Sequence, residues 1–378
     1  MAVVFEHALT PLLPEVRAPV KAVFDPGWYG VMVFFLVSGY IVPASLERTG
    51  SVRAFWISRV FRLYPLFGLA AAAMALLVAL GGREFHVWWS TRPVALALGH
   101  LTMLQNLLHM PNLINTMWTL SYEMAFYLLL TTMFVLGIHR KSVAGAFVFA
   151  LAALVGGPAA LLSTGGPGRM LGVALGVTAL VAGGIAAVLR GSARVRQAGA
   201  IVVGLTVLVL LAVNQSYPGP RQGLLILATM FAGTALYRAE RGEIPWRWVG
   251  WVALVPLVGM WLARPALGSQ TAIAAAWVTF AAGMALRRQV MPDVLRRLGL
   301  ISYSVYLLHL LLLEVAQWLW PEPFAQPFTL RLAIFVYAVA ILLGLSALTW
   351  RFVEAPAQRL AKRLTRENVQ SSLPLSAR

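Results

Sequence analysis

The chain has 378 residues, of which 60% are hydrophobic and only 11% are charged, and its mean hydropathy is +0.78. Soluble domains carry about 25% charged residues, so this composition excludes an ordinary soluble enzyme. The chain has no cysteine, which excludes disulfides, cysteine-ligated zinc and a thiol nucleophile. With 30 Lys and Arg against 13 Asp and Glu, the formal net charge is +17. The positions of these charges must decide what the basic excess means.

Long uncharged stretches recur along the whole chain. A helix needs about 20 apolar residues to cross a hydrocarbon layer of ~30 Å, and stretches near that length predict an all-α, polytopic integral membrane protein with about 10–12 transmembrane helices. The expected spans are residues 28–46, 65–81, 117–137, 142–162, 170–189, 198–213, 223–237, 248–262, 270–286, 299–319 and 330–350.

The opening segment, Ala2 to Leu13, is apolar but too short to cross a bilayer. It has no basic region before it and no small-residue cleavage pattern after it, so we do not expect a secretory signal. We expect it to be the end of a span that begins upstream.

The basic residues alternate between connections. Lys and Arg gather in the cytoplasmic loops of membrane proteins. Alternate connections and the tail hold 22 of the 30 Lys and Arg residues, within residues 48–62, 140–141, 190–196, 238–247, 287–297 and 351–378. We therefore expect a multi-pass protein of the cell membrane with this set inside. A nucleic-acid-binding face would collect its arginines on one patch, so we expect the lipid bilayer and no nucleic acid as a partner.

The longest polar connections, residues 82–116 outside and 47–64 inside, are too short to hold a separate core. The first contains an apolar run, Pro93 to Leu108, that predicts a further helix in or on the membrane. The basic stretch from Arg351 to Arg366 predicts a cytoplasmic surface helix. We expect a membrane domain over residues 1–356 and a basic tail over residues 357–378.

A few polar side chains lie inside the predicted spans, where a central charge costs about 2.5 to 3.5 kcal/mol. Glu123 and Tyr127, four residues apart, share a helix face, and so do Tyr306 and His309. His7 lies in the opening segment. Each of these groups has a plain alternative as a hydrogen-bonding partner between helices. Glu314 has no partner that the sequence identifies, and we take it as structural.

Their combination favours a reaction. A neutral histidine, with a pKa near ~6.5, can accept a proton from an alcohol and return it to a leaving group. Arg59 and Arg62, three apart at the cytoplasmic end of their span, are either membrane anchors or a site for the phosphates of a nucleotide-type donor. Together these groups indicate acyl transfer within a membrane.

The chain resembles the acyltransferase 3 family of polytopic membrane acyltransferases from His7 to about Pro356. The resemblance rests on motifs in the family's order, namely His7, Gly30 to Tyr40, Arg59 to Pro65, Trp118 to Glu123, Ser302 to His309 and Arg351 to Pro356. Family members usually carry an arginine eleven positions before the first histidine, which here would precede Met1. We expect the natural start to lie upstream.

The resemblance implies transfer of an acyl group, which we expect to be acetyl, from acyl-CoA to a hydroxyl of a carbohydrate or envelope glycan. It implies His7 as the base and Arg59 and Arg62 at the donor site. Glu123 and His309 are further catalytic candidates in the central cavity. Trp118 and Tyr306 are candidates for substrate binding.

Two alternatives remain at this point. The acceptor is a secondary metabolite such as a macrolide, or the chain is a multi-span transporter with Glu123 and His309 on its pathway. We expect acyl-CoA as a co-substrate, no bound cofactor and no metal.

Overall fold

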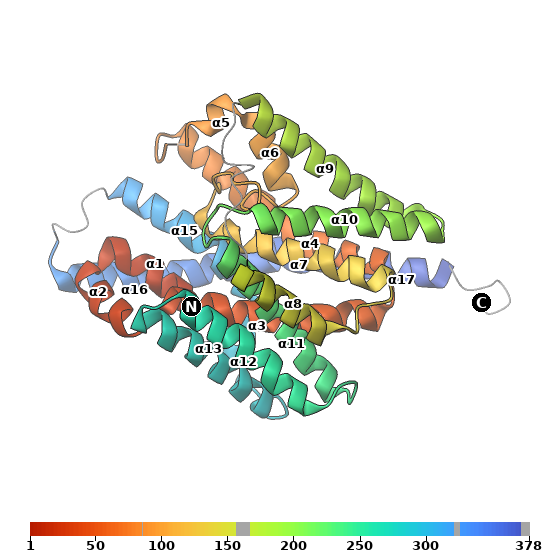
Figure 1. Cartoon of the computed structure of the whole chain (residues 1–378). Coiled ribbons are helices and arrows are strands. Elements are labelled where there is room, and N and C mark those ends of the chain that lie inside the picture. The colour runs from red at the N-terminus through yellow and green to blue at the C-terminus, as the bar shows by residue number, and fades with distance from the viewer. Residues whose placement is uncertain (85, 156–166, 321–325, 372–378) are drawn as a thin grey trace.

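The computed structural model describes residues 1–84, 86–155, 167–320 and 326–371, and within these ranges all regular structure is helical (Figure 1). The helices are α1 (Ala2–Leu12), α2 (Pro14–Val23), α3 (Pro26–Thr49), α4 (Val52–Ala79), α5 (Trp88–Thr91), α6 (Pro93–Leu101), α7 (Trp118–Val135), α8 (Ser142–Val155), α9 (Pro167–Arg190), α10 (Ala193–Val213), α11 (Pro220–Glu240), α12 (Trp246–Ala263), α13 (Leu267–Leu286), α14 (Asp293–Leu300), α15 (Ser302–Leu319), α16 (Phe328–Thr349) and α17 (Ala355–Ser371).

Each of the eleven predicted spans coincides with a helix, and the predicted all-α polytopic membrane fold is confirmed. Residues 156–162, in the predicted span 142–162, lie outside the described residues. Among the described residues, seven helices are long and apolar enough to cross a membrane. The bent pair α14 and α15, which meet at 64°, raises this number to eight.

This number is below the predicted ten to twelve, and the composition of the central helices explains the difference. Helices α7 and α11 have 18 and 21 residues. They are long enough to cross a membrane but are not among the seven because of their more polar composition, and most of their residues are buried against other helices. A helix surrounded by protein can carry polar residues that a lipid-facing helix cannot. Helix α11 packs against α3, α8 and α12, and α7 packs against α10.

A tight reversal joins α3 to α4. Gly50 ends α3 in the left-handed conformation, with φ of 61°, which glycine adopts without a steric penalty. Ser51 then caps α4 by accepting a hydrogen bond from the Ala54 amide at 3.2 Å. The predicted connection 47–64 is therefore wrong for most of its length, because the helix begins at Val52. Arg59 and Arg62 consequently lie on a helix.

Small residues bring α3 and α11 into close contact. A Cβ atom on Gly39 would lie 2.0 Å from the Met230 carbonyl oxygen, and one on Gly233 would lie 2.6 Å from the Leu36 carbonyl oxygen. The Thr234 hydroxyl donates a hydrogen bond to the Gly39 carbonyl at 2.8 Å. This is the small-residue packing that membrane helices use in place of a hydrophobic driving force.

The connection 82–116 contains α5 and α6, and its apolar run forms a helix only as far as Leu101. Glu314 of α15, which the sequence left without a partner, forms an ion pair of 2.7 Å with Arg83 from this connection. The sequence did not show this pair because the two residues meet only through the packing of α4 against α15.

The basic tail is helical and continues the last span. A π-helical turn, Trp350–Glu354, joins α16 to α17, which packs against α4. The expected boundary at residues 356 and 357 falls inside α17. In Figure 1, α17 and the connections α9–α10 and α11–α12 lie at the same end of the molecule, as the charge pattern predicts.

Candidate functional site

Two histidines from distant parts of the chain face each other. The ring centroids of His7, on α1, and His309, on α15, lie 5.3 Å apart with the rings tilted by 43°. His309 is 1% exposed, and its Nδ1 lies 3.2 Å from the Val305 carbonyl oxygen. Because a carbonyl only accepts hydrogen bonds, we assign the proton of a neutral His309 to Nδ1. Its buried Nε2 has no hydrogen-bond partner within the described residues.

Charged residues surround His7 at the start of α1. Its neighbour Glu6 is buried and forms ion pairs with Lys21 at 2.9 Å and Arg17 at 3.5 Å. Lys21 also lies 3.9 Å from the Asp25 carboxylate. The Glu6 and Asp25 carboxylates are thus paired with cations of α2, and neither forms an ion pair with His7 within the described residues.

Tyr306 connects the histidine pair to α7. Its ring lies 6.0 Å from that of His309 and stacks on Phe34 at 6.2 Å. Its hydroxyl lies 2.8 Å from Thr119 Oγ1 and 3.1 Å from the Thr116 carbonyl oxygen. These bonds fix the first turn of α7 beside the two imidazoles.

Trp118, adjacent to Thr119, belongs to an aromatic cluster. Its ring lies 5.3 Å from Tyr217, 5.9 Å from Tyr122 and 6.3 Å from Trp28. The Arg264 guanidinium covers the face of Trp28 at 4.1 Å, a cation–π distance. Trp118 is 8% exposed while Tyr217 is 56% exposed, so the cluster extends from the core to the surface.

The middle of α7 carries the predicted acid. Glu123 is buried and accepts a hydrogen bond from the Tyr127 hydroxyl, one turn further along the same helix. The Arg59 guanidinium lies 5.5 Å from the centroids of both the Tyr127 and the Phe55 rings. Tyr127 therefore connects Glu123 to Arg59.

The two predicted donor-site arginines differ in setting. Arg59 is 8% exposed and donates to Ser45 Oγ at 3.2 Å, and its Nε has no partner among the described residues. Arg62 is exposed and interacts electrostatically with Glu123 and Glu354. Both guanidiniums thus lie beside the middle of α7, near Glu123.

These groups follow one another along the axis of helix α7 and form a column of side chains beside it. With a rise of ~1.5 Å per residue, Glu123 lies about 6 Å and Tyr127 about 12 Å along the axis from Thr119. The structure thus brings the predicted residues together as two neighbouring groups. The group at the start of α7 comprises His7, His309, Tyr306 and Trp118, and the group at its middle comprises Glu123, Arg59 and Arg62.

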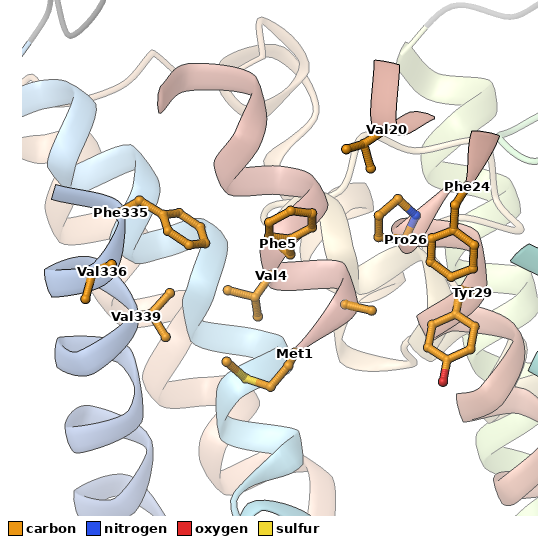
Figure 2. A pocket seen from close by; sticks show the side chains of 11 residues that line it. Met1, Val4, Phe5, Val20, Phe24, Pro26, Tyr29, Phe335, Val336 and Val339 are labelled. Carbon is orange, nitrogen blue, oxygen red and sulfur yellow. The ribbon is translucent and has the colours of Figure 1, made fainter. Parts of the chain in front are cut away.

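An apolar pocket of about 480 Å³ lies beside α1, between α2, α3 and α16 (Figure 2). Its lining includes Phe5, Phe24 and Phe335, with the Tyr29 hydroxyl at one edge. None of the predicted site residues lines it. A polar acceptor finds no hydrogen-bonding partner in most of this pocket, which separates it from the column along α7.

The match to a family of known proteins agrees with this arrangement. The family model described as an acyltransferase domain, acyltransferase 3, matches residues 1–350. The chain belongs to the acyltransferase 3 family. The predicted enzyme class is thereby confirmed, because the matched domain is that of an acyltransferase. Membership of this family also favours an enzyme over the transporter alternative.

Two curated relatives share part of the chain. A protein of Acidianus two-tailed virus named "Putative acetyltransferase ORF330" is 27% identical over 152 residues, which are 40% of this chain and 41% of that protein. Nodulation protein 10 of Rhizobium leguminosarum bv. viciae is 29% identical over 147 residues, which are 33% of this chain and 38% of that protein. The chain thus spans about two fifths of the length of the curated relatives it matches. No solved structure is a significant match.

Sequence reasoning missed several residues that the structure places at the site. Ser45, which accepts from Arg59, lies on the preceding helix α3, and Tyr217, which packs on Trp118, lies far along the chain from its partner. Trp28 directly follows the Pro26–Gly27 start of α3, where an aromatic residue resembles an ordinary interfacial anchor. Tyr127, in contrast, was identified from the sequence, because it lies four residues after Glu123 on the same helix face.

Proposed function

We propose that this protein transfers an acyl group, expected to be acetyl, from acyl-CoA to a hydroxyl of a carbohydrate or envelope glycan at the cell membrane. The observation that carries the proposal is the buried Nε2 of His309 beside His7, which has no hydrogen-bond partner in the part of the chain that the structure describes. A buried polar atom without a partner costs free energy, so its retention supports a role for a bound group. The acyltransferase domain match supports the reaction class.

In this proposal the acyl-CoA donor binds near Arg59 and Arg62. Arginine binds phosphate bidentately, and Arg62 is the more accessible of the pair. Arg59 is fixed by Ser45 and by the Tyr127 ring, which suits it to orient a donor held by other groups. The thioester then extends along α7, past Glu123, to the histidines.

The acceptor occupies the start of α7. Aromatic faces pack well against the apolar faces of sugar rings, and Trp118 supplies such a surface next to Tyr306. The Tyr306 hydroxyl is fixed by Thr119 and the Thr116 carbonyl, so its position relative to His309 is set before a substrate arrives.

His7 acts as the general base in this mechanism. Its imidazole accepts the proton of the acceptor hydroxyl as the oxygen attacks the thioester carbonyl carbon. The new carbon–oxygen bond forms the ester, the carbon–sulfur bond breaks, and the imidazolium returns the proton to the departing thiolate. A stepwise route, in which His7 first carries the acyl group, uses the same atoms in two stages.

Turnover of acetyl-CoA by the full chain in lipid nanodiscs tests the proposal. We expect His7→Ala to lower kcat by about 10²- to 10⁴-fold, the usual contribution of a general base. His86→Ala is the matched control, because His86 is exposed and lies in the connection after α4, away from the column. Equal release of coenzyme A by wild type and His7→Ala, with any hydroxyl acceptor, would rule the proposal out.

A further inference from the structure

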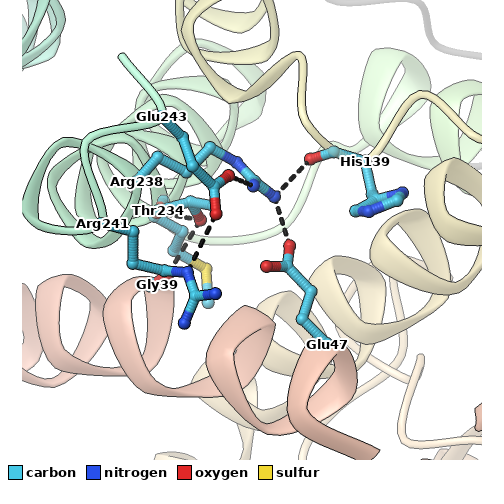
Figure 3. Close-up of polar contacts among 8 residues, drawn as sticks. Gly39, Glu47, His139, Thr234, Arg238, Arg241 and Glu243 are labelled. Atoms are coloured by element: carbon cyan, nitrogen blue, oxygen red, sulfur yellow. Dashed lines mark hydrogen bonds and ion pairs between the residues drawn. The ribbon is translucent and has the colours of Figure 1, made fainter. Parts of the chain in front are cut away.

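A second group of arginines, distinct from Arg59 and Arg62, lies where α3, α7 and α11 end (Figure 3). Arg238 of α11 is 1% exposed. It donates to the Glu47 carboxylate, to Glu243 at 2.7 Å and to the His139 carbonyl at 2.8 Å. Both terminal nitrogens of this buried guanidinium are thus paired, and Arg238 holds Glu47 and Glu243 in place.

A pocket of about 330 Å³ adjoins this network. It is lined by residues of α3 and α11, namely Ala44, Glu47, Arg48, Tyr237 and Arg241. Arg48 is exposed and forms no ion pair or hydrogen bond within the described residues. Arg241 lies over the Tyr237 ring at 5.6 Å and bonds Glu243 through Nε at 2.9 Å. Its two terminal nitrogens are not used by that bond.

The charge around the pocket favours an anion. Glu47 and Glu243 are both paired with Arg238, so neither repels a negative ligand as a free carboxylate would. Three arginines, namely Arg48, Arg238 and Arg241, therefore lie near the two carboxylates of Glu47 and Glu243. Arg140 and Lys141, which directly follow His139, add two more positive charges nearby. A guanidinium pair of this kind matches the geometry of phosphate oxygens.

The pocket is next to the expected donor site. Ala44, in its lining, directly precedes Ser45, which accepts the hydrogen bond from Arg59. Arg59 is too deeply buried to meet a phosphate that stays in water. Coenzyme A carries a diphosphate and a separate ribose phosphate, which is more negative charge than Arg59 and Arg62 can neutralise. Further cations at the surface are therefore needed.

We propose that the pocket between Arg48 and Arg241 binds a phosphate group, and that in the working enzyme this phosphate belongs to the nucleotide part of the acyl donor. The proposal rests on acyl-CoA as the donor in the proposed function. A phospholipid headgroup carries the same chemistry, and the experiment separates the two sources.

Equilibrium binding of coenzyme A and of pantetheine, which lacks phosphate, to the full chain in phosphatidylcholine nanodiscs tests the pocket. We expect Arg48→Ala with Arg241→Ala to raise the Kd for coenzyme A by about tenfold, the effect of about 1.4 kcal/mol. The Kd for pantetheine should change by less than a factor of about two. Arg196→Ala is the control, because Arg196 is exposed on α10 and does not line the pocket.

A single charge reversal, Arg48→Glu, guards against misfolding of the double variant, because the Arg48 side chain is exposed and forms no ion pair or hydrogen bond with any described residue. We expect it to weaken coenzyme A binding as well. Equal affinities of wild type and both variants for coenzyme A would overturn the proposal. So would a loss that is as large for pantetheine as for coenzyme A.

Nanodiscs with added phosphatidylglycerol separate the two sources of phosphate. If the donor occupies the pocket, the difference between wild type and variant persists in phosphatidylcholine alone. A difference that appears only with the anionic lipid assigns the pocket to a headgroup and overturns the donor assignment. Binding is measured without turnover, so a wild-type protein that binds coenzyme A but transfers no acetyl group contradicts only the proposed function.

Discussion

His309 accepts no hydrogen bond at Nε2 within the described residues, although the ring of His7 lies only 5.3 Å away, centroid to centroid. At this separation the two imidazole rings are in direct contact, and Nε2 of His309 is a buried nitrogen at the edge of that contact. The relation joins the first helix of the chain to the fifteenth, so the geometry of the site depends on the packing of α1 against α15.

The first prediction concerns His309. We expect His309→Gln to lower kcat for acetyl transfer by at least about tenfold, because glutamine keeps a polar group but cannot take up a proton at neutral pH. Steady-state release of coenzyme A measures this. His100→Gln is the comparison, since both of its ring nitrogens are occupied, by the Leu96 carbonyl and the Leu113 amide. A kcat unchanged in His309→Gln would limit this residue to a structural role.

The second prediction concerns Arg59. Lysine has no planar group to lie over the Tyr127 ring while it bonds Ser45, so Arg59→Lys should misplace the charge. We expect the KM for acetyl-CoA to rise by about tenfold. Arg53→Lys, at an exposed position near the start of the same helix, is the matched control. If both variants have the wild-type KM, Arg59 is an ordinary membrane anchor.

The third prediction concerns the contact between α3 and α11. Gly39→Ala places a methyl group against the Met230 carbonyl, and the two helices must separate. We expect a loss of about 1 to 3 kcal/mol in the free energy of unfolding, typical of overpacking. Tryptophan fluorescence during thermal unfolding in detergent measures it. Gly344→Ala, in α16, has open space at its Cβ and should not lower the melting temperature.

The fourth prediction concerns pH. Burial alone would raise the pKa of Glu243, but hydrogen bonds from Arg241 and Arg238 outweigh burial and lower that pKa below its ordinary value. Such a carboxylate stabilises the fold above its unfolded pKa of about 4.3 and loses this effect as the pH falls through the lowered pKa. We expect Glu243→Gln to melt at a lower temperature than wild type at neutral pH.

This difference in melting temperature should shrink as the pH falls below about 4, because wild-type Glu243 then becomes protonated as well. Glu84→Gln, at an exposed position, is the control and should melt like wild type throughout. A difference between Glu243→Gln and wild type that is the same at every pH would contradict the role assigned to the carboxylate charge.

The positions of the helices follow from the sequence, because the hydrocarbon layer demands uncharged stretches of fixed length. The largest error concerned α4, whose basic first half resembles a loop in composition. A helix can carry Arg53, Arg59 and Arg62 where its face meets water or protein. Hydropathy therefore predicted the apolar half of α4 and missed its start at Ser51, although that residue is a good helix cap.

The pairing of helices does not follow from the sequence. Glu314 forms an ion pair with Arg83, and Arg238 forms one with Glu47, although the partners are far apart in the sequence. Many arginines of this chain were equally plausible partners, and only the packing decides among them. The predicted site residues were found by chemistry and resemblance, whereas Ser45 and Tyr217 became visible only once α3, α7 and the connection after α10 were placed in space.

The π-helical turn after α16 has a mechanical consequence. It lets the helix run without a break from Phe328 to Thr365, 38 residues or about 57 Å at ~1.5 Å per residue. This length exceeds the hydrocarbon thickness of ~30 Å, so the basic end must project well beyond the lipid tails. Because that end rests on α4, any change in the tilt of this rod is transmitted to the helix that carries Arg59 and Arg62. Bilayer thickness and the position of these two arginines are thus physically coupled.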